Sequence, residues 1–130
     1  TFGGGHTDSD AFLHLPIEKI IFTGDLLATK FQPGMSSSHP QEWLKILAKI
    51  KALNPIQLMP GHGELATLAD VELIEQYINK LLQMAKQNQQ TGGTAESAAA
   101  LQPPTFTEGW NNAEAFELNM KFLHELSQPK

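Results

Sequence analysis

Apolar residues recur along the chain in two patterns, as short compact runs and as longer stripes with helical spacing. The runs predict strands over residues 11–15, 19–22 and 56–59, and the letters PIE between the first two predict a hairpin turn. The stripes predict helices from Pro40 to about residue 53, from Thr67 to about residue 87, and over about residues 112–126. Strands and helices therefore alternate, which indicates an α/β fold with helices packed on a sheet.

Local signals support several of these boundaries. Pro40 suits the first turn of a helix, where its missing N–H costs nothing. Thr67 with Asp70 three residues later forms a capping-box pattern. Residues 88–105 form a low-complexity connector, in which Thr94 is placed to cap a short helix through residue 101. We expect a single domain over residues 1–130, with no internal repeat.

The helical stripes also predict which side chains form the core. We expect these to point inward: Trp43, Leu44, Leu47, Ile50 and Leu53 of the first helix, Leu68, Val71, Ile74, Ile78, Leu81 and Leu82 of the second, and Phe116, Met120, Phe122, Leu123 and Leu126 of the last. Trp110 is expected to be a further core anchor. His14 is expected to be a packing or surface residue of its strand, and His124 a solvated residue of the last helix.

Composition narrows the range of functions. The 130 residues are 41% hydrophobic and 18% charged, as in ordinary folded domains. The formal charge of −5 argues against nucleic acid or an anionic membrane as the main partner. The absence of cysteine excludes disulfides and thiolate chemistry, and it leaves the compartment, periplasmic or cytoplasmic, open. Thr1 is a poor natural start, so we expect the sequence to be a piece of a longer protein.

Three short polar stretches share a context that favours ligand binding. The letters GHT precede a predicted strand, and the letters TGD and PGHG each follow one, which places His6, Asp25 and His62 at strand ends. Glycine beside each residue allows the backbone to turn so that the three side chains converge. Two imidazoles and one carboxylate suit a divalent metal, zinc first, with manganese or iron as alternatives.

Each of these residues also has a simpler structural explanation. His6 is about as well suited to a hydrogen bond within a turn as to a metal, and Asp25 is also a common turn or cap residue. His62, between two glycines after a proline, is the hardest to explain structurally. His39, in the loop after Asp25, is expected to precede a helix, with substrate contact as the weaker alternative.

The segment GGGHTDSDAFLHLPIEKIIFTGDLL, followed at a distance by LMPGHG, resembles the C-terminal half of the metallo-β-lactamase superfamily. The resemblance includes the hairpin with LP-EK at its turn, the helix led by Trp43 and the long helix after PGHG. It covers nearly the whole chain. It implies an α/β fold that is half of an αββα sandwich, a mixed sheet with helices on its outer face.

The resemblance also implies a chemistry. It assigns His6 to a first zinc, Asp25 to a position bridging two zinc ions, and His62 to the second zinc. A hydroxide held by the metals would attack a carbonyl or ester-like centre, because zinc lowers the pKa of bound water to near 7. Some β-lactamases carry cysteine where Asp25 stands, which weakens an antibiotic-hydrolysing role. The substrate class, whether lactam, lactone, thioester or other ester, stays open.

One departure from the family limits these expectations. The leading H-x-H-x-D-H motif, which supplies most of the remaining ligands, does not occur in this chain. Each metal would then keep one histidine and a share of Asp25, fewer than the three protein ligands that zinc requires. We therefore expect a zinc-dependent hydrolase of a small-molecule substrate whose isolated 130-residue piece is inactive. The alternative is a non-catalytic half-domain that associates with a chain carrying the missing half, or with itself.

Overall fold

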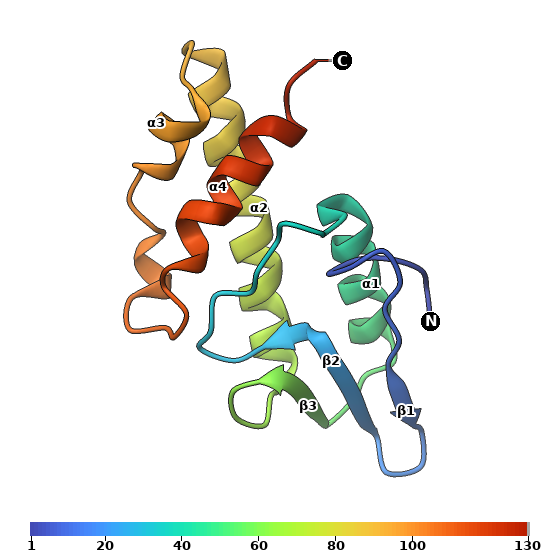
Figure 1. Ribbon diagram of the computed structural model, residues 1–130. Helices are drawn as coiled ribbons and strands as arrows, with labels where there is room; N and C mark the ends of the chain where they lie inside the picture. Colours follow the sequence, from blue (N-terminus) through green and yellow to red (C-terminus); the bar gives the residue numbers. More distant parts are fainter. Residues whose placement is uncertain (130) are drawn as a thin grey trace.

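A three-stranded mixed sheet with helices on one side organises the chain (Figure 1). The computed structural model describes residues 1–129. The sheet order is β1 (Leu13–Leu15), β2 (Ile20–Ala28) and β3 (Gln57–His62). β1 pairs antiparallel with β2, as the predicted hairpin requires, and β2 pairs parallel with β3. The predicted α/β class, with a mixed sheet and helices, is confirmed.

Two strands run further than the sequence pattern predicts. β2 continues from Phe22 through the letters TGD to Ala28, and β3 continues through PGH to His62. The strand ends predicted at residues 22 and 59 are therefore too early: Asp25 lies within β2, and His62 is the last residue of β3. The register between β2 and β3 shifts on either side of Gly24, and this irregularity lets the pairing continue past residues that usually end a strand.

The two central helices begin as predicted. α1 (Pro40–Ala52) has proline in its first turn, and α2 (Leu68–Gln90) begins with a capping box in which the Thr67 N–H donates to Asp70 Oδ2 at 2.9 Å. The core of α1 also includes Ile46, which the prediction omitted. Leu53 lies outside the helix and is 37% exposed, so its predicted burial is wrong. The predicted apolar stripe extends one residue beyond the helix.

The C-terminal part adds α3 (Ala95–Ala99), a short 3-10 turn η1 (Thr105–Thr107) and α4 (Ala115–Leu126). Thr94 caps α3 as predicted, by accepting from the Ser97 N–H at 3.1 Å. α4 packs against α2 and α3. Two predictions about α4 are wrong, because Leu126 is 52% exposed and His124 is only 2% exposed.

His124 is buried because α4 lies across the end of α2 and its ring meets two amide side chains. Asn88 Nδ2 lies 3.4 Å from His124 Nδ1, and Gln128 Nε2 lies 3.2 Å from His124 Nε2. Both ring nitrogens therefore have polar neighbours that stand in for water. Helical periodicity alone does not show where a crossing helix will cover a polar residue.

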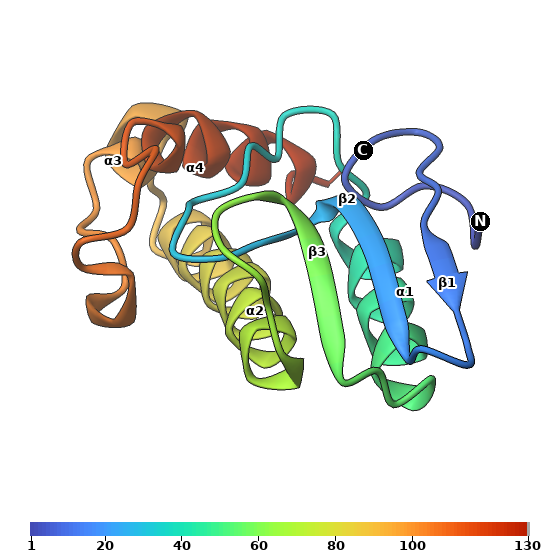
Figure 2. The same cartoon turned by 90° about the horizontal axis from the view of Figure 1, so that it is seen from below.

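The two faces of the sheet differ sharply. α1 and α2 lie against one face, where Ile21 and Leu58 are fully buried (Figure 2). No helix is drawn on the other face, where register aligns Leu13 and Met59 with Phe22 between them. Leu13 is 57% and Phe22 39% exposed. We call these three residues the open-face row. Among residues 1–129, no helix combines the length and apolar character of a membrane span.

Candidate metal site

Asp25 and His62 lie on the neighbouring strands β2 and β3, and their side chains meet. Asp25 Oδ1 is 3.4 Å from His62 Nε2. Both side chains are about half exposed, at 48% and 51%. A carboxylate and an imidazole in this position are accessible from solvent, so they are available to a ligand.

Gly61 allows this approach. A Cβ at Gly61 would overlap Asp25 Oδ1 and would lie 2.9 Å from the Asp25 backbone nitrogen. Any larger residue would therefore push the carboxylate or the strand away from its neighbour. The glycine of PGHG gives the Asp25 carboxylate its place beside β3.

The Phe31 ring packs on the face of the His62 imidazole. The two rings stack with centroids 4.3 Å apart and planes 3° from parallel. Stacking uses the face of the imidazole and leaves its edge free, so Nε2 still faces Asp25. The backbone beside this pair is joined as well, because the Thr29 N–H donates to the His62 carbonyl at 3.1 Å.

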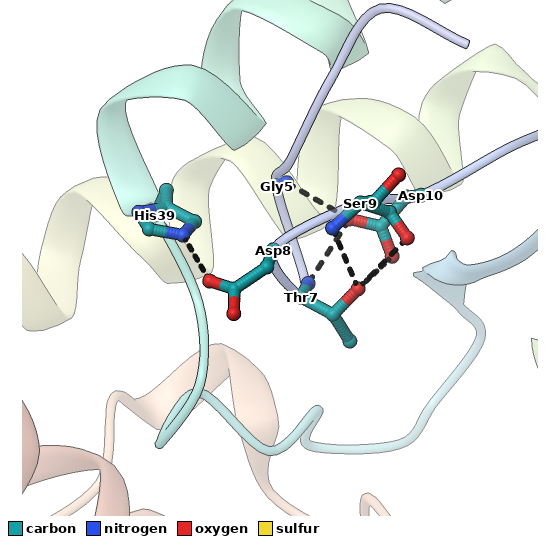
Figure 3. Close-up of polar contacts among 6 residues, drawn as sticks. All are labelled: Gly5, Thr7, Asp8, Ser9, Asp10 and His39. Atoms are coloured by element: carbon teal, nitrogen blue, oxygen red, sulfur yellow. Dashed lines mark hydrogen bonds and ion pairs between the residues drawn. The ribbon is translucent and has the colours of Figure 1, made fainter.

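Asp10 holds together the N-terminal loop that contains Gly5 and Thr7 (Figure 3), and His6 lies between these two residues in the sequence. Asp10 Oδ2 accepts from the N–H groups of Gly5 at 2.8 Å and Thr7 at 3.0 Å. The Thr7 hydroxyl donates to Asp10 Oδ1 at 3.0 Å. The loop that carries His6 is therefore closed around one carboxylate.

Gly5, just before His6, serves close packing. It is buried, and a Cβ there would lie 3.1 to 3.2 Å from atoms of Ile46, Leu26 and Trp43. The chain thus passes directly over α1, and the His6 ring meets the Trp43 ring edge-on at 5.3 Å. The glycine next to His6 therefore has a packing reason that does not depend on a metal.

His39 closes the same loop from the other side. His39 Nε2 lies 2.8 Å from Asp8 Oδ1, and the His39 N–H donates to the Gly5 carbonyl at 2.7 Å (Figure 3). His39 also stands immediately before α1, as predicted. Its contacts connect the N-terminal loop to the start of that helix.

The Asp25–His62 pair suits zinc in the type of its ligand atoms and in the distance between them. Two ligands of one tetrahedral zinc, each about 2.1 Å from the metal, lie roughly 3.4 Å apart. The number of ligands falls short, because residues 1–129 contain no group of three or more side chains arranged to hold a metal. The structure brings Asp25 and His62 together, and it does not gather His6 with them.

Sequence reasoning missed Phe31 and Asp10. Phe31 is an isolated aromatic residue in an otherwise polar loop shortly after Asp25, and that position was a usable signal. Asp10 follows Thr7 by three residues, the same T-x-x-D spacing that marks the start of α2. Both residues act on a candidate ligand, Phe31 by direct contact and Asp10 through the loop that carries it.

A known protein matches part of this chain in sequence. The chain is 32% identical over 87 residues to a metallo-beta-lactamase type 2 of Bacteroides fragilis; the match takes in 62% of this chain and 34% of that protein. The chain therefore spans about a third of that relative's length. No protein-family model matches the sequence.

Solved structures show the same partial fold. The DIM-1 metallo-beta-lactamase superposes with a TM-score of 0.55 at 22% identity, over 62% of this chain and 40% of that one. VMB-1 gives 0.55 at 24%, over 62% and 39%. A metallo-beta-lactamase from Pontibacter korlensis gives 0.55 at 20%, over 60% and 39%. In each case the match takes in about two fifths of the solved chain.

Proposed function

For a chain that is related to the metallo-β-lactamases and carries part of their fold, we propose that it supplies part of the active site of a metal-dependent hydrolase. The observation that carries the proposal is the Asp25–His62 pair, a carboxylate and an imidazole 3.4 Å apart on adjacent strands. The relationship to a metallo-beta-lactamase type 2 supports the same reading.

In this proposal zinc is the metal, with two ions in a complete domain. Asp25 would serve both ions, His62 would hold the second, and His6 would hold the first together with further ligands. When bound, zinc would supply a hydroxide nucleophile at neutral pH for hydrolysis of a carbonyl or ester-like centre of a small molecule. Asp25 is the residue on which both metals depend, so we assign it the catalytic role.

The residues of this chain have defined tasks in that site. Phe31 holds the plane of the His62 imidazole by stacking on it. Gly61 leaves room for the Asp25 carboxylate beside β3. The Asp10 carboxylate closes the loop that carries His6. These groups orient ligands, and the ligands missing from the set have to come from outside this sequence.

Zinc titration of isotopically labelled protein, followed by NMR, tests the proposal. The signals of Asp25 and His62 should move together as zinc is added, and the Asp25→Ala variant should lose the response. His14, in β1, provides an internal control whose ring signals should stay in place. Zinc-induced shifts that avoid Asp25 and His62 would contradict the proposal.

Activity provides the second test. In a chain that carries the complete domain, Asp25→Ala should abolish turnover because neither metal keeps its bridge. Retained turnover in that variant would show that Asp25 does not have the proposed role.

The open-face row favours a second candidate, a non-catalytic half-domain that associates with another copy or with a chain carrying the missing half. Leu13 and Phe22 leave apolar surface in water on a face that no helix covers. Each 100 Å² of such surface forgoes about 2.5 kcal/mol, so covering it is favourable. We favour association of two copies through these faces.

Sedimentation velocity at micromolar concentration distinguishes this candidate. We expect a dimer that Phe22→Ser converts to monomer. Ile17→Ser is the matched control, because Ile17 is 91% exposed in the hairpin turn and lies outside the row. A folded monomer at all concentrations would rule out self-association.

A further inference from the structure

The orientation of the His62 ring depends on its neighbours. The side chain is 51% exposed, and its ring contacts the stacked Phe31 ring and the Asp25 carboxylate. Rotation about the bond to a histidine ring is soft, so an exposed imidazole is not fixed by its own backbone. The stacked Phe31 ring sets the plane of the imidazole, so whatever fixes Phe31 contributes to the direction in which His62 Nε2 points.

Phe31 lies in a segment that belongs to no strand or helix, yet its backbone is tied on both sides. The Asn111 N–H donates to the Lys30 carbonyl at 2.8 Å, and the Gln32 N–H donates to the Asn111 carbonyl at 3.0 Å. Asn112 Nδ2 adds a bond of 2.8 Å to the Gln32 carbonyl. The residues just before α4 thus pair with the residues that flank Phe31.

Asn119 of α4 holds the next part of the same segment. It is fully buried, and its amide donates to the Pro33 carbonyl at 2.8 Å while its Oδ1 accepts from the Met35 N–H at 2.8 Å. One side chain therefore satisfies both a donor and an acceptor of the loop backbone.

Tyr77 of α2 completes the set. Its hydroxyl accepts from Asn119 Nδ2 at 3.0 Å and donates to Gln32 Oε1 at 2.9 Å. Gln32 is 2% exposed and Tyr77 is fully buried. We call Gln32, Tyr77 and Asn119 the buried amide–tyrosine network. Buried polar groups cost stability unless each is satisfied, and these are satisfied by one another and by the loop.

An apolar residue at position 119 would suit the helix better. Phe116, Met120 and Leu123 around it form the buried apolar face of α4. An asparagine on that face serves the loop backbone at Pro33 and Met35, two residues and four residues beyond Phe31. The presence of asparagine at position 119 is therefore explained by its bonds to the loop backbone and not by the packing of α4.

We propose that Asn119, acting with Tyr77, is a positioning residue for His62: α4 and α2 fix residues 30–35 and so keep Phe31 stacked on the imidazole. The proposal rests on the proposed function for its consequence, because His62 is the ligand whose direction would be set. We call this series of contacts, from Asn119 and Tyr77 through residues 30–35 and Phe31 to His62, the relay. It can be measured in metal-free protein.

The test is the NMR spectrum of the histidine rings in metal-free protein at one fixed pH of about 9, where histidine side chains are in general neutral. A His62→Gln variant identifies the His62 signals. Stacking on Phe31 places the His62 ring protons over an aromatic face and shifts them upfield. Phe31→Leu keeps an apolar side chain but removes the stacked ring. Its spectrum therefore gives the full downfield shift of the His62 ring protons that is expected when stacking is lost.

Tyr77→Phe and Asn119→Ala are the informative variants. Both should move the His62 ring protons part or all of the way to the Phe31→Leu position, while the His14 signals stay in place. Asn88→Ala is the matched control, because it also removes an asparagine bonded to backbone and side chain, at Thr94 and Ser97, away from the loop. It should leave the His62 signals unchanged.

Each outcome decides the proposal. Should Asn119→Ala unfold the chain, the milder Tyr77→Phe carries the test. Folded variants whose His62 signals do not move, or an equal movement in Asn88→Ala, would overturn the relay. Zinc titration of the same samples separates the two proposals: a relay intact in a protein that binds no zinc contradicts the proposed function alone. Zinc binding with no relay contradicts only the positioning role.

Discussion

The two faces of the sheet differ in how fully helices cover them. On the face covered by α1 and α2, Ile21 and Leu58 are fully buried and belong to one continuous core. On the other face, the open-face row leaves Leu13 and Phe22 partly in water. The Asp25–His62 pair, near the ends of β2 and β3, is half exposed. Helices of this chain cover the first face, and no helix among the described residues covers the second.

The fold and the candidate metal site therefore depend on different residues. Burial of the covered face stabilises the sheet. The candidate ligands lie apart from that core: Asp25 and His62 contact each other on β2 and β3, and His6 lies in the N-terminal loop. The described residues thus build one mixed sheet with helices on one face, and they bring together two of the three candidate ligands.

Neighbouring residues of β2 give the sharpest test of the comparison. Ile21→Ala should lower the free energy of unfolding by about 2 to 5 kcal/mol, because it removes fully buried atoms and leaves a cavity. Phe22→Ala, one residue away on the open face, should cost less than about 1 kcal/mol in the monomer. Urea unfolding measures both. Equal losses would mean that the open face is packed as tightly as the covered one.

Alkaline pH tests the covered side through Tyr77. Burial raises the pKa of the Tyr77 hydroxyl above its usual value, and the bond from Asn119 offsets this in part. Above about pH 10 the unfolded chain releases a proton that the folded chain keeps, so stability falls by up to about 1.4 kcal/mol per pH unit. Below that pH the contribution is fully present.

The measurement is direct, because the chain has a single tyrosine. Tyrosinate absorbance should appear only at a pH well above 10 in the folded protein, and Tyr77→Phe should flatten the alkaline loss of stability relative to wild type. Ionisation at the ordinary tyrosine pKa in folded protein would show that the network around Asn119 is open to water.

Asp10 provides the smallest effect, on the exposed side of the comparison. Asp10→Ala removes the acceptor for the N–H groups of Gly5 and Thr7 and should cost about 1 kcal/mol. Hydrogen exchange should become faster at those two amides and stay unchanged at Ile21 in the core. A global loss of protection would place the N-terminal loop within the cooperative core.

The sequence predicted the elements that depend on local signals. Proline at the start of α1, the Thr67–Asp70 capping box and the Thr94 cap all appear where the pattern indicated. Strand ends were predicted poorly, because glycine at position 24 and proline at position 60 are turn residues in most contexts. Here they lie in an irregular parallel ladder that carries β2 and β3 further.

The site was predictable in its residues but not in its geometry. Glycine-flanked Asp25 and His62 come together, with Asp25 inside β2 and His62 as the last residue of β3. The Phe31 stack and the Asn119 bonds connect residues that are 31 and more than 80 positions apart in the chain. Such pairings depend on how helices cross, which periodicity within one element does not encode. The described residues do not gather His6 with this pair, so its part in the metal site stays a proposal for a complete domain.

Titration calorimetry with zinc tests the central claim, that this chain holds part of a metal site. We predict weak binding by the isolated chain, diminished further in Asp25→Ala and in His62→Ala and unchanged in His14→Ala. We also predict no metal-dependent hydrolysis by that chain. Tight, stoichiometric zinc binding by a monomer would contradict the claim, because it would require a complete ligand set within these residues.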